Sequence, residues 1–338
     1  MLKKKVLRMV LPIAIGIAVC VWLFQRDYSA EVWRSIHFDS RAILGILLAL
    51  AAVVGRDFGL TWRFHTLGGG DLNWRRSMRV DLMCAFTSAI TPSVVGGSAL
   101  AIFYLNKEGI KVGRATSLTL ATLFLDEMFF VVFCPIIILL VPAEQLFDTG
   151  VFSDETTFLE GVKLVFWLVY AGICVWAAIL YFAIIGRPEA MSRLLEKVSR
   201  WKIWGRKGEG LKETARNMLA TSKWIKGQSA QWWLNIFGGT VLSWFSRYLI
   251  VNALFWGFVP EASPLMVFAR QFVVWVVLMV SPTPGGSGVS EWLFTNYYGD
   301  LIGSLGIALV LAMFWRILSY YIYLIAGSIM IPSYFKKK

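Results

Sequence analysis

Apolar residues occupy long runs of this chain, and polar residues are concentrated in the shorter segments between the runs. Six runs reach about the 20 residues with which a helix crosses the roughly 30 Å core of a bilayer. These runs are 6–24, 43–60, 115–141, 162–185, 233–259 and 301–331. The pattern therefore predicts an all-α fold, that of a polytopic helical membrane protein.

Two further apolar segments, 78–106 and 265–299, are each interrupted near the middle. The first break contains Thr91-Pro92 and Gly96-Gly97-Ser98, and the second contains Ser281-Pro282-Thr283-Pro284-Gly285-Gly286-Ser287-Gly288. Proline removes a backbone donor and glycine loosens a helix, so each segment is either a kinked span or a re-entrant hairpin.

The distribution of basic residues distinguishes these two interpretations. Cytoplasmic segments of membrane proteins carry an excess of lysine and arginine. With a cytoplasmic N-terminus, only a re-entrant first segment places the basic stretch 187–226 inside and the acidic stretch 144–160 outside. The same assignment puts two shorter basic groups inside, which are Arg63, Arg75 and Arg76, and then Lys107, Lys111 and Arg114. For the second segment, only a re-entrant path returns the C-terminal Lys336, Lys337 and Lys338 to the inside. We therefore expect both hairpins to be re-entrant, to enter from opposite faces and to meet near the middle of the membrane.

The first apolar run follows Lys3, Lys4, Lys5 and Arg8, as the apolar region of a signal peptide would. It is longer than such a region usually is, and no A-x-A-like cleavage site follows it. We therefore expect segment 1–41 to form a retained N-terminal anchor helix.

The rest of this single membrane domain contains two similar parts. Segment 42–141 (repeat A, with its hairpin at 78–106) and segment 233–332 (repeat B, with its hairpin at 265–299) each have the order span, broken hairpin, span. Segment 142–232 between them contains an external acidic loop, one span and a cytoplasmic basic amphipathic stretch. Both breaks share Ser or Thr before Pro, followed by Gly-Gly-Ser. This similarity predicts an inverted-topology repeat.

Four ionisable residues, Asp126, Glu127, Arg247 and Arg316, lie within predicted spans. A charge at the bilayer centre costs at least about 2.5 kcal/mol, so these side chains must face the protein interior or a wet cavity. One interpretation is that they form inert ion pairs between the repeats. The other is that the arginines bind a phosphate, while the acids position them or contact a cationic headgroup or a proton.

The two breaks favour the second interpretation. Unwound backbone inside a membrane is tolerated only where it is buried in protein or lines a cavity, and helix N-termini suit an anion. The glycines let a headgroup approach the backbone, or alternatively allow tight helix packing. The candidate substrate-binding residues are Thr91, Pro92, Gly96, Gly97, Ser98, Asp126, Glu127, Arg247, Ser281, Pro284, Gly285, Gly286, Glu291 and Arg316. Arg79 and Asp81, which open the first hairpin, are candidate gate charges.

Composition narrows the function further. The 338 residues are 57% hydrophobic and carry a formal net charge of +12. Because the basic residues collect in loops and in an amphipathic stretch at 188–225, they indicate membrane topology and anionic lipid headgroups, not nucleic acid. The alternative for that stretch is a solvated linker helix. With two histidines, and with Cys20, Cys84, Cys134 and Cys174 inside apolar runs, we expect no metal, cofactor or disulfide framework.

At this point the residues resemble a known family. The stretch 281–291, with Pro284-Gly285-Gly286-x-Gly288-x-x-Glu291 as its most specific part, is similar to the flippase-type transmembrane domain of lysylphosphatidylglycerol synthases and its stand-alone relatives. Thr91-Pro92, Gly96-Gly97 and the pair Asp126-Glu127 fit the same family. The family more usually has Leu and Arg where this chain has Ser287 and Ser290, so a headgroup contact by an arginine at 290 is missing. The synthases add a soluble aminoacyltransferase domain, so the resemblance implies translocation without the transferase.

We therefore expect a lipid flippase or transporter in the cytoplasmic (inner) membrane of a prokaryote, with both termini in the cytoplasm. A phospholipid, an aminoacylated lipid or a polyprenyl phosphate would bind between the hairpins by its anionic or aminoacylated headgroup. One alternative is an intramembrane transferase with Asp126 or Glu127 as general base. Another is a scaffold that recruits partners through its basic amphipathic stretch. The oligomeric state is open, with a homodimer among the alternatives.

Overall fold

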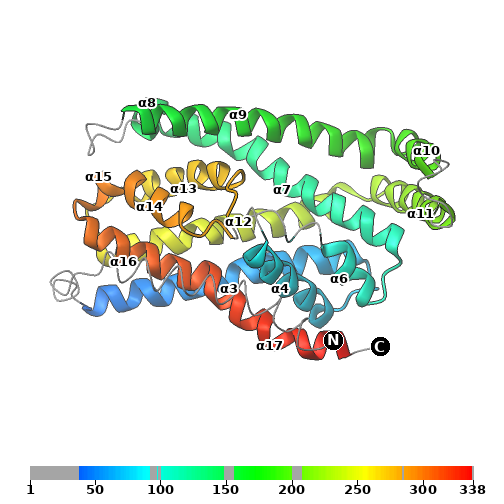
Figure 1. Ribbon diagram of the computed structural model, residues 1–338, viewed down its shortest axis with the longest axis horizontal. Coiled ribbons are helices and arrows are strands. Elements are labelled where there is room, and N and C mark those ends of the chain that lie inside the picture. Colours follow the sequence, from blue (N-terminus) through cyan, green and yellow to red (C-terminus); the bar gives the residue numbers. More distant parts are fainter. Residues whose placement is uncertain are drawn as a thin grey trace.

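The computed structural model describes residues 38–91, 97, 100–147, 156–199, 208–283 and 285–336. Within these ranges the chain forms helices and turns and no strand, as an all-α polytopic membrane protein should (Figure 1). The predicted anchor run at 6–24 lies outside the described residues.

Four helices in the described part of the chain are long and apolar enough to cross a membrane. They cover Ser40–Gly68, Val112–Leu140, Glu160–Gly186 and Gly306–Ile331 and match four of the six predicted runs. The run predicted at 233–259 also forms a 29-residue helix, α12 (Ala230–Phe258). It is not among the four, and its buried positions include the polar Thr240, Ser243 and Ser246.

Helix α3 (Ser40–Gly68) is longer than its apolar run. It begins where the Asp39 carboxylate accepts a hydrogen bond from the Ala42 backbone N–H (2.8 Å), and it ends where Gly69 adopts a left-handed conformation with φ of 56°. Arg63 therefore lies inside the helix and is only 3% exposed. The prediction that Arg63 belongs to a cytoplasmic loop is wrong, because an arginine that is paired inside the protein does not end a spanning helix.

Helices α3 and α12 run antiparallel in close backbone contact. A Cβ atom on Gly45 would come within 2.8 Å of the Gly257 Cα, and one on Gly59 within 2.6 Å of the Gly239 carbonyl oxygen. Small residues let membrane helices approach this closely, since no side chain separates the backbones. This contact joins the predicted repeat A to the predicted repeat B.

Both interrupted segments form two helical limbs around a break. The first contains α4 (Trp74–Ile90) and α6 (Ala101–Lys107), and the second contains α13 (Pro264–Leu278), α14 (Val289–Tyr297) and the short α15 (Gly299–Ile302). Figure 1 shows the first hairpin toward the end of the bundle that carries α10 and α11, and the second toward the end that carries α8. Entry of the two hairpins from opposite faces of a bilayer stays a prediction.

An arginine and a carboxylate close each hairpin at its base. In the first hairpin, Arg79 Nη2 donates to Glu108 Oε2 (3.0 Å). In the second, both Nη atoms of Arg270 donate to the Asp300 carboxylate (2.5 and 2.7 Å), and Nη1 also donates to the Tyr297 carbonyl (2.8 Å). The partners are 29 and 30 residues apart in sequence, so the two pairs occupy corresponding places in the two hairpins.

The remaining helices cover one side and one end of the bundle. Helix α7 (Val112–Leu140) packs against α9 (Thr156–Tyr181), which continues into the π-helix η1 (Phe182–Gly186), and α8 (Ala143–Phe147) lies between them in sequence (Figure 1). Helices α10 (Pro188–Ser199) and α11 (Gly208–Lys226) form a pair, and α11 packs on α7. They cover most of the predicted amphipathic stretch, whose position on a membrane leaflet stays a prediction.

The last spanning helix changes its geometry near the middle. Helix α16 (Leu305–Arg316) passes into the π-helix η3 (Ile317–Tyr321) and then into α17 (Ile322–Lys336). Such π-helical turns are frequent at functional sites, because the wider turn changes the direction of the side chains that follow it. Here the wide turn begins directly after Arg316.

Candidate functional site

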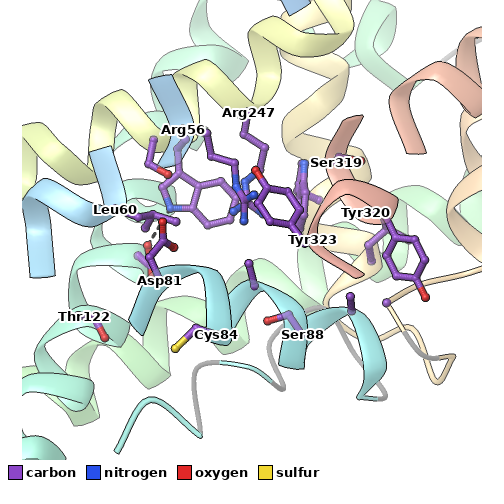
Figure 2. Close-up of a pocket in the computed structure, with 18 of the residues that line it drawn as sticks. Arg56, Leu60, Asp81, Cys84, Ser88, Thr122, Arg247, Ser319, Tyr320 and Tyr323 are labelled. Carbon is purple, nitrogen blue, oxygen red and sulfur yellow. Dashed lines mark hydrogen bonds between the residues drawn. The ribbon is translucent and has the colours of Figure 1, made fainter. Parts of the chain in front are cut away.

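A cavity of about 160 Å³ lies between the two hairpins and the long helices α3, α7 and α12. Helices α16 and α17 and the π-helix η3 complete its wall (Figure 2). Its lining includes seven charged side chains, namely Arg56, Arg63, Arg247, Arg316, Asp81, Asp126 and Glu127. A cavity with this many charges inside an apolar bundle is a functional-site candidate, since burying them costs free energy.

The first group of charges joins α3, α7 and α12. Both Nη atoms of Arg63 donate to the Asp126 carboxylate (2.6 and 3.2 Å), and Nη1 also lies 3.3 Å from Thr240 Oγ1. Trp244 Nε1 donates to Asp126 Oδ1 (2.9 Å). Asp126 is therefore paired with an arginine of the same predicted repeat and holds the indole of Trp244 in place.

The second group is formed by the second hairpin and α16. Arg316 Nε donates to Glu291 Oε1 (2.8 Å), Nη2 donates to Ser287 Oγ (3.1 Å), and the guanidinium lies 4.0 Å from the centre of the Tyr320 ring. The other Glu291 oxygen accepts from the Gly288 N–H (2.7 Å) and from Ser290 Oγ (2.8 Å). A carboxylate of the protein thus occupies the N-terminus of α14, where we expected a headgroup.

Arg247 differs from these arginines because it forms no ion pair with any described residue. Its guanidinium lies between two indoles, 4.6 Å from the Trp244 ring centre and 4.5 Å from that of Trp275, and its Nε atom has no hydrogen-bond partner. Cation–π contacts hold the group in place without neutralising its charge. Arg247 therefore keeps its charge available to the cavity.

Arg56 is a second, weakly compensated cation beside Arg247. Gly55 contacts Ser246 across the α3–α12 interface, which brings the next residues of the two helices close together, and the two guanidinium groups repel each other. Arg56 lies 3.2 Å from Asp57 Oδ1 and 4.0 Å from the Tyr323 ring centre, but its Nε and Nη1 have no hydrogen-bond partner. Figure 2 shows Arg56 and Arg247 reaching into the cavity beside Tyr323.

Two carboxylates of the cavity also lack full compensation. Asp81, on α4, is 2% exposed and its Oδ2 has no hydrogen-bond partner. Glu127 Oε2 is likewise buried and without a partner. Neither side chain forms an ion pair with a described residue. Among the described residues, no group of three His, Cys, Asp or Glu side chains could hold a metal ion.

The two hairpin apices touch one another. The Gly285 N–H donates to the Thr91 carbonyl oxygen (3.1 Å), and a Cβ on Gly285 would overlap the Tyr320 ring. Gly285 and Gly286 have positive φ values of 55° and 72°, which L side chains rarely adopt. Gly97 packs against α4, where its N–H donates to Ser88 Oγ (3.1 Å). The glycines thus build the turns and their contact.

The predicted site residues divide into three sets. Asp126, Glu127, Arg247, Gly285 and Arg316 line the cavity. Thr91, Gly97, Ser281, Gly286 and Glu291 build the two apices around it; Ser281 Oγ lies 3.1 Å from Thr283 Oγ1, and Thr91 Oγ1 donates to the Thr87 carbonyl (2.7 Å). Pro92, Gly96, Ser98 and Pro284 lie outside the described residues.

The sequence of residues 9–327 matches the family described as the lysylphosphatidylglycerol synthase TM region. The chain belongs to this family. The expected resemblance is thereby confirmed over nearly the whole chain. A UPF0104 membrane protein of Archaeoglobus fulgidus is 25% identical over 322 residues, which are 94% of this chain and 94% of that protein. No solved structure matches the chain at a significant level.

Sequence reasoning overlooked several cavity residues of this lysylphosphatidylglycerol synthase TM-region protein. The pattern of basic residues places Arg63 in a loop, but Arg63 follows Arg56 by seven residues, two helical turns, and so shares its helix face. That spacing is the signal that could have found it. Trp244, Trp275 and Tyr323 had no such signal, because an aromatic residue in an apolar run is ordinary in a membrane helix.

Proposed function

We propose that this protein translocates a lipid with a phosphate-containing headgroup across the membrane in which it lies. The headgroup binds in the cavity between the two hairpins, and the acyl chains stay in the bilayer. No covalent bond of the lipid is changed.

The observation that carries this proposal is the uncompensated charge of Arg247, reinforced by Arg56. Arginine binds phosphate oxygens with two parallel N–H groups, and such charge-assisted bonds are strong where water is excluded. An arginine retained in an apolar bundle without a carboxylate requires an anion to offset its desolvation. The aromatic contacts of Arg247 are made to ring faces, and its Nε has no hydrogen-bond partner, so the guanidinium can donate to that anion.

Family membership supports lipid as the substrate. The matching family is named for the transmembrane region of lysylphosphatidylglycerol synthase, and lysylphosphatidylglycerol is a phospholipid. The contact between the two apices supports the same conclusion, because a headgroup at this place has protein from both hairpins around it. A polyprenyl phosphate or an aminoacylated lipid would present the same phosphate to Arg247.

The test is translocation in reconstituted vesicles. Phosphatidylglycerol with a fluorescent acyl tail is placed in both leaflets, and a membrane-impermeant reductant bleaches the outer one, so movement appears as additional bleaching. The protein should accelerate the loss of fluorescence from lipid that reaches the outer leaflet, and Arg247→Ala should abolish this acceleration. Arg247→Lys should retain only part of it, because an ammonium cannot make the paired contact of a guanidinium. Arg193→Ala removes an exposed arginine of α10 and should behave as the unmodified protein.

Three outcomes would contradict the proposal. Full translocation by a correctly folded Arg247→Ala protein would show that the cavity cation is not used. No movement of any phosphate lipid by the unmodified protein would favour a scaffold. A lipid of altered mass recovered from the vesicles would favour a transferase. Arg316→Ala is a weaker test, because it also leaves Glu291 buried without its partner.

A further inference from the structure

Asp81 is the most buried carboxylate of the cavity that has no cationic partner. It is 2% exposed, its Oδ2 has no hydrogen-bond partner, and it forms no ion pair with a described residue. It comes from α4 of the first hairpin, and Figure 2 shows it on the cavity wall. Neither the fold nor the proposed translocation has yet given this group a role.

The surroundings of Asp81 contain charges of both signs. Arg56, Arg63 and Arg247 attract a negative charge there, whereas Asp57 repels it. The charged and titratable groups around it are Arg56, Asp57 and Arg63 from α3, Cys84 from α4, Tyr104 from α6, Asp126 and Glu127 from α7, Arg247 from α12, Tyr320 from η3 and Tyr323 from α17. Asp126 is already paired with Arg63.

An ionised carboxylate that is buried without a partner costs several kcal/mol. A proton removes this cost, and so does the close approach of an arginine. Among the described residues that line the cavity, Arg56 and Arg247 are the arginines without a hydrogen bond to a carboxylate, and they are also the groups assigned to the lipid phosphate. The Asp81 carboxylate and the lipid phosphate are therefore two anions in one cavity, and each disfavours the other through Coulomb repulsion.

We propose that Asp81 is a proton-binding site whose protonation is linked to binding of the lipid phosphate. This inference rests on the proposed function. When the phosphate binds to Arg247 and Arg56, Asp81 takes up a proton from water and becomes neutral. When the phosphate leaves, the proton is released and the carboxylate again balances the arginines. Lipid and proton thus enter and leave the cavity together, which links translocation to a proton gradient.

The proposal predicts how lipid binding depends on pH. The phosphodiester of phosphatidylglycerol stays ionised across the neutral range, so a pH effect reports on the protein. The affinity for the lipid is highest at a pH where Asp81 is protonated in both the lipid-free and the lipid-bound protein. It falls as rising pH ionises Asp81 in the lipid-free protein. Linkage limits the fall in affinity to about tenfold per pH unit for one carboxyl group.

The experiment is calorimetric titration of the detergent-solubilised full chain with short-chain dioctanoyl phosphatidylglycerol over a pH series. Repeating it in buffers of different ionisation enthalpy gives the number of protons taken up. Four proteins are compared, namely the unmodified chain, Asp81→Asn, Asp81→Glu and Asp71→Asn. Asp71 is an exposed carboxylate that pairs with Arg114 at the surface, so its removal is the matched control.

The unmodified protein and Asp71→Asn should bind more weakly as pH rises and take up a proton on binding. Asp81→Asn should bind with an affinity that is independent of pH and without proton uptake, whereas Asp81→Glu should restore both effects. Full pH dependence in Asp81→Asn would overturn the proposal and assign the proton to another group, such as Glu127. Absence of proton uptake in the unmodified protein would overturn it even if Asp81→Asn did not fold.

Arg247→Ala separates this inference from the proposed function. If Arg247→Ala loses phosphatidylglycerol binding while Asp81→Asn keeps the pH profile of the unmodified protein, the phosphate site stands and the proton site fails. If Arg247→Ala binds the lipid normally, the phosphate site itself fails.

Discussion

At the scale of single residues, one tryptophan connects the two kinds of charge in the cavity. Trp244 donates its indole N–H to the Asp126 carboxylate, and the face of the same ring contacts the Arg247 guanidinium. Asp126 is in turn fixed by the paired contact of Arg63. Asp126 therefore acts on the proposed phosphate site through Trp244, as a positioning residue, and its two partners Arg63 and Trp244 belong to different predicted repeats.

Substituting Trp244 separates its two contacts. Trp244→Phe keeps an aromatic face for Arg247 but loses the hydrogen bond to a carboxylate, which should lower the free energy of unfolding by about 2 kcal/mol. Trp244→Leu loses both contacts and should also weaken phosphatidylglycerol binding. Thermal unfolding in detergent and calorimetric titration measure these effects. Trp176→Phe on the exposed side of α9 is the control. Equal lipid affinity in the Phe and Leu variants would show that the ring does not position Arg247.

At the scale of elements, the two hairpins are built on one plan with different solvent exposure. Each has an arginine on its first limb and a carboxylate after its second. The Arg270 side chain is 2% exposed, whereas that of Arg79 is 32% exposed. A buried pair is costly to break because one charge is left without a partner, but an exposed charge is rehydrated. The second hairpin is therefore the more firmly closed of the two.

Removing one carboxylate from each hairpin measures this difference. Asp300→Asn should lower the free energy of unfolding by about 3–5 kcal/mol, since it leaves Arg270 buried without its charge partner. Glu108→Gln should cost about 1 kcal/mol or less, because Arg79 reaches water. Thermal unfolding of both variants under identical detergent conditions provides the comparison. A larger loss for Glu108→Gln would contradict the assignment of the firmer hairpin.

At the scale of the whole molecule, the contact between α3 and α12 assembles the cavity. Glycines on both helices bring the two backbones together, and Arg56 and Arg247 follow directly after Gly55 and Ser246, which contact each other. The two hairpins then approach from opposite ends of the bundle and touch through Gly285 and Thr91 (Figure 1). With the bilayer normal along the long axis of the bundle, this arrangement fits the topology that the basic residues predict.

Single cysteines test that topology directly. In a variant without native cysteines, Lys111→Cys and Lys197→Cys should react with a membrane-impermeant maleimide only from the cytoplasmic side. Glu144→Cys and Glu261→Cys should react only from the outside. All four positions are exposed in the structure, so labelling depends on sidedness and not on burial. Labelling of Lys197→Cys and Glu144→Cys from the same side would contradict the predicted orientation.

The features that depend on local chemistry could be predicted from the amino-acid sequence. Long apolar runs specify spanning helices because a bilayer leaves backbone groups no partner outside the helix. The positions of proline and glycine predicted both helix breaks, since these residues interrupt helices. The Pro-Gly-Gly-x-Gly-x-x-Glu stretch indicated the family. The structure explains why these residue types stand there: Gly285, Gly286 and Gly288 have positive φ values, and Glu291 caps α14 and binds Arg316.

Which charges are neutralised depends on how the helices pack, and the sequence did not reveal it. Arg63 and Asp126 are 63 residues apart, and Tyr323 and Asp57 are 266 apart, so no local pattern reveals these partners. The sequence presented Arg247 and Arg316 as equivalent, but folding gives Arg316 a carboxylate and leaves Arg247 between two indoles. Coulomb energies depend on distances of a few ångströms between helices, and those distances exist only once the helices have packed.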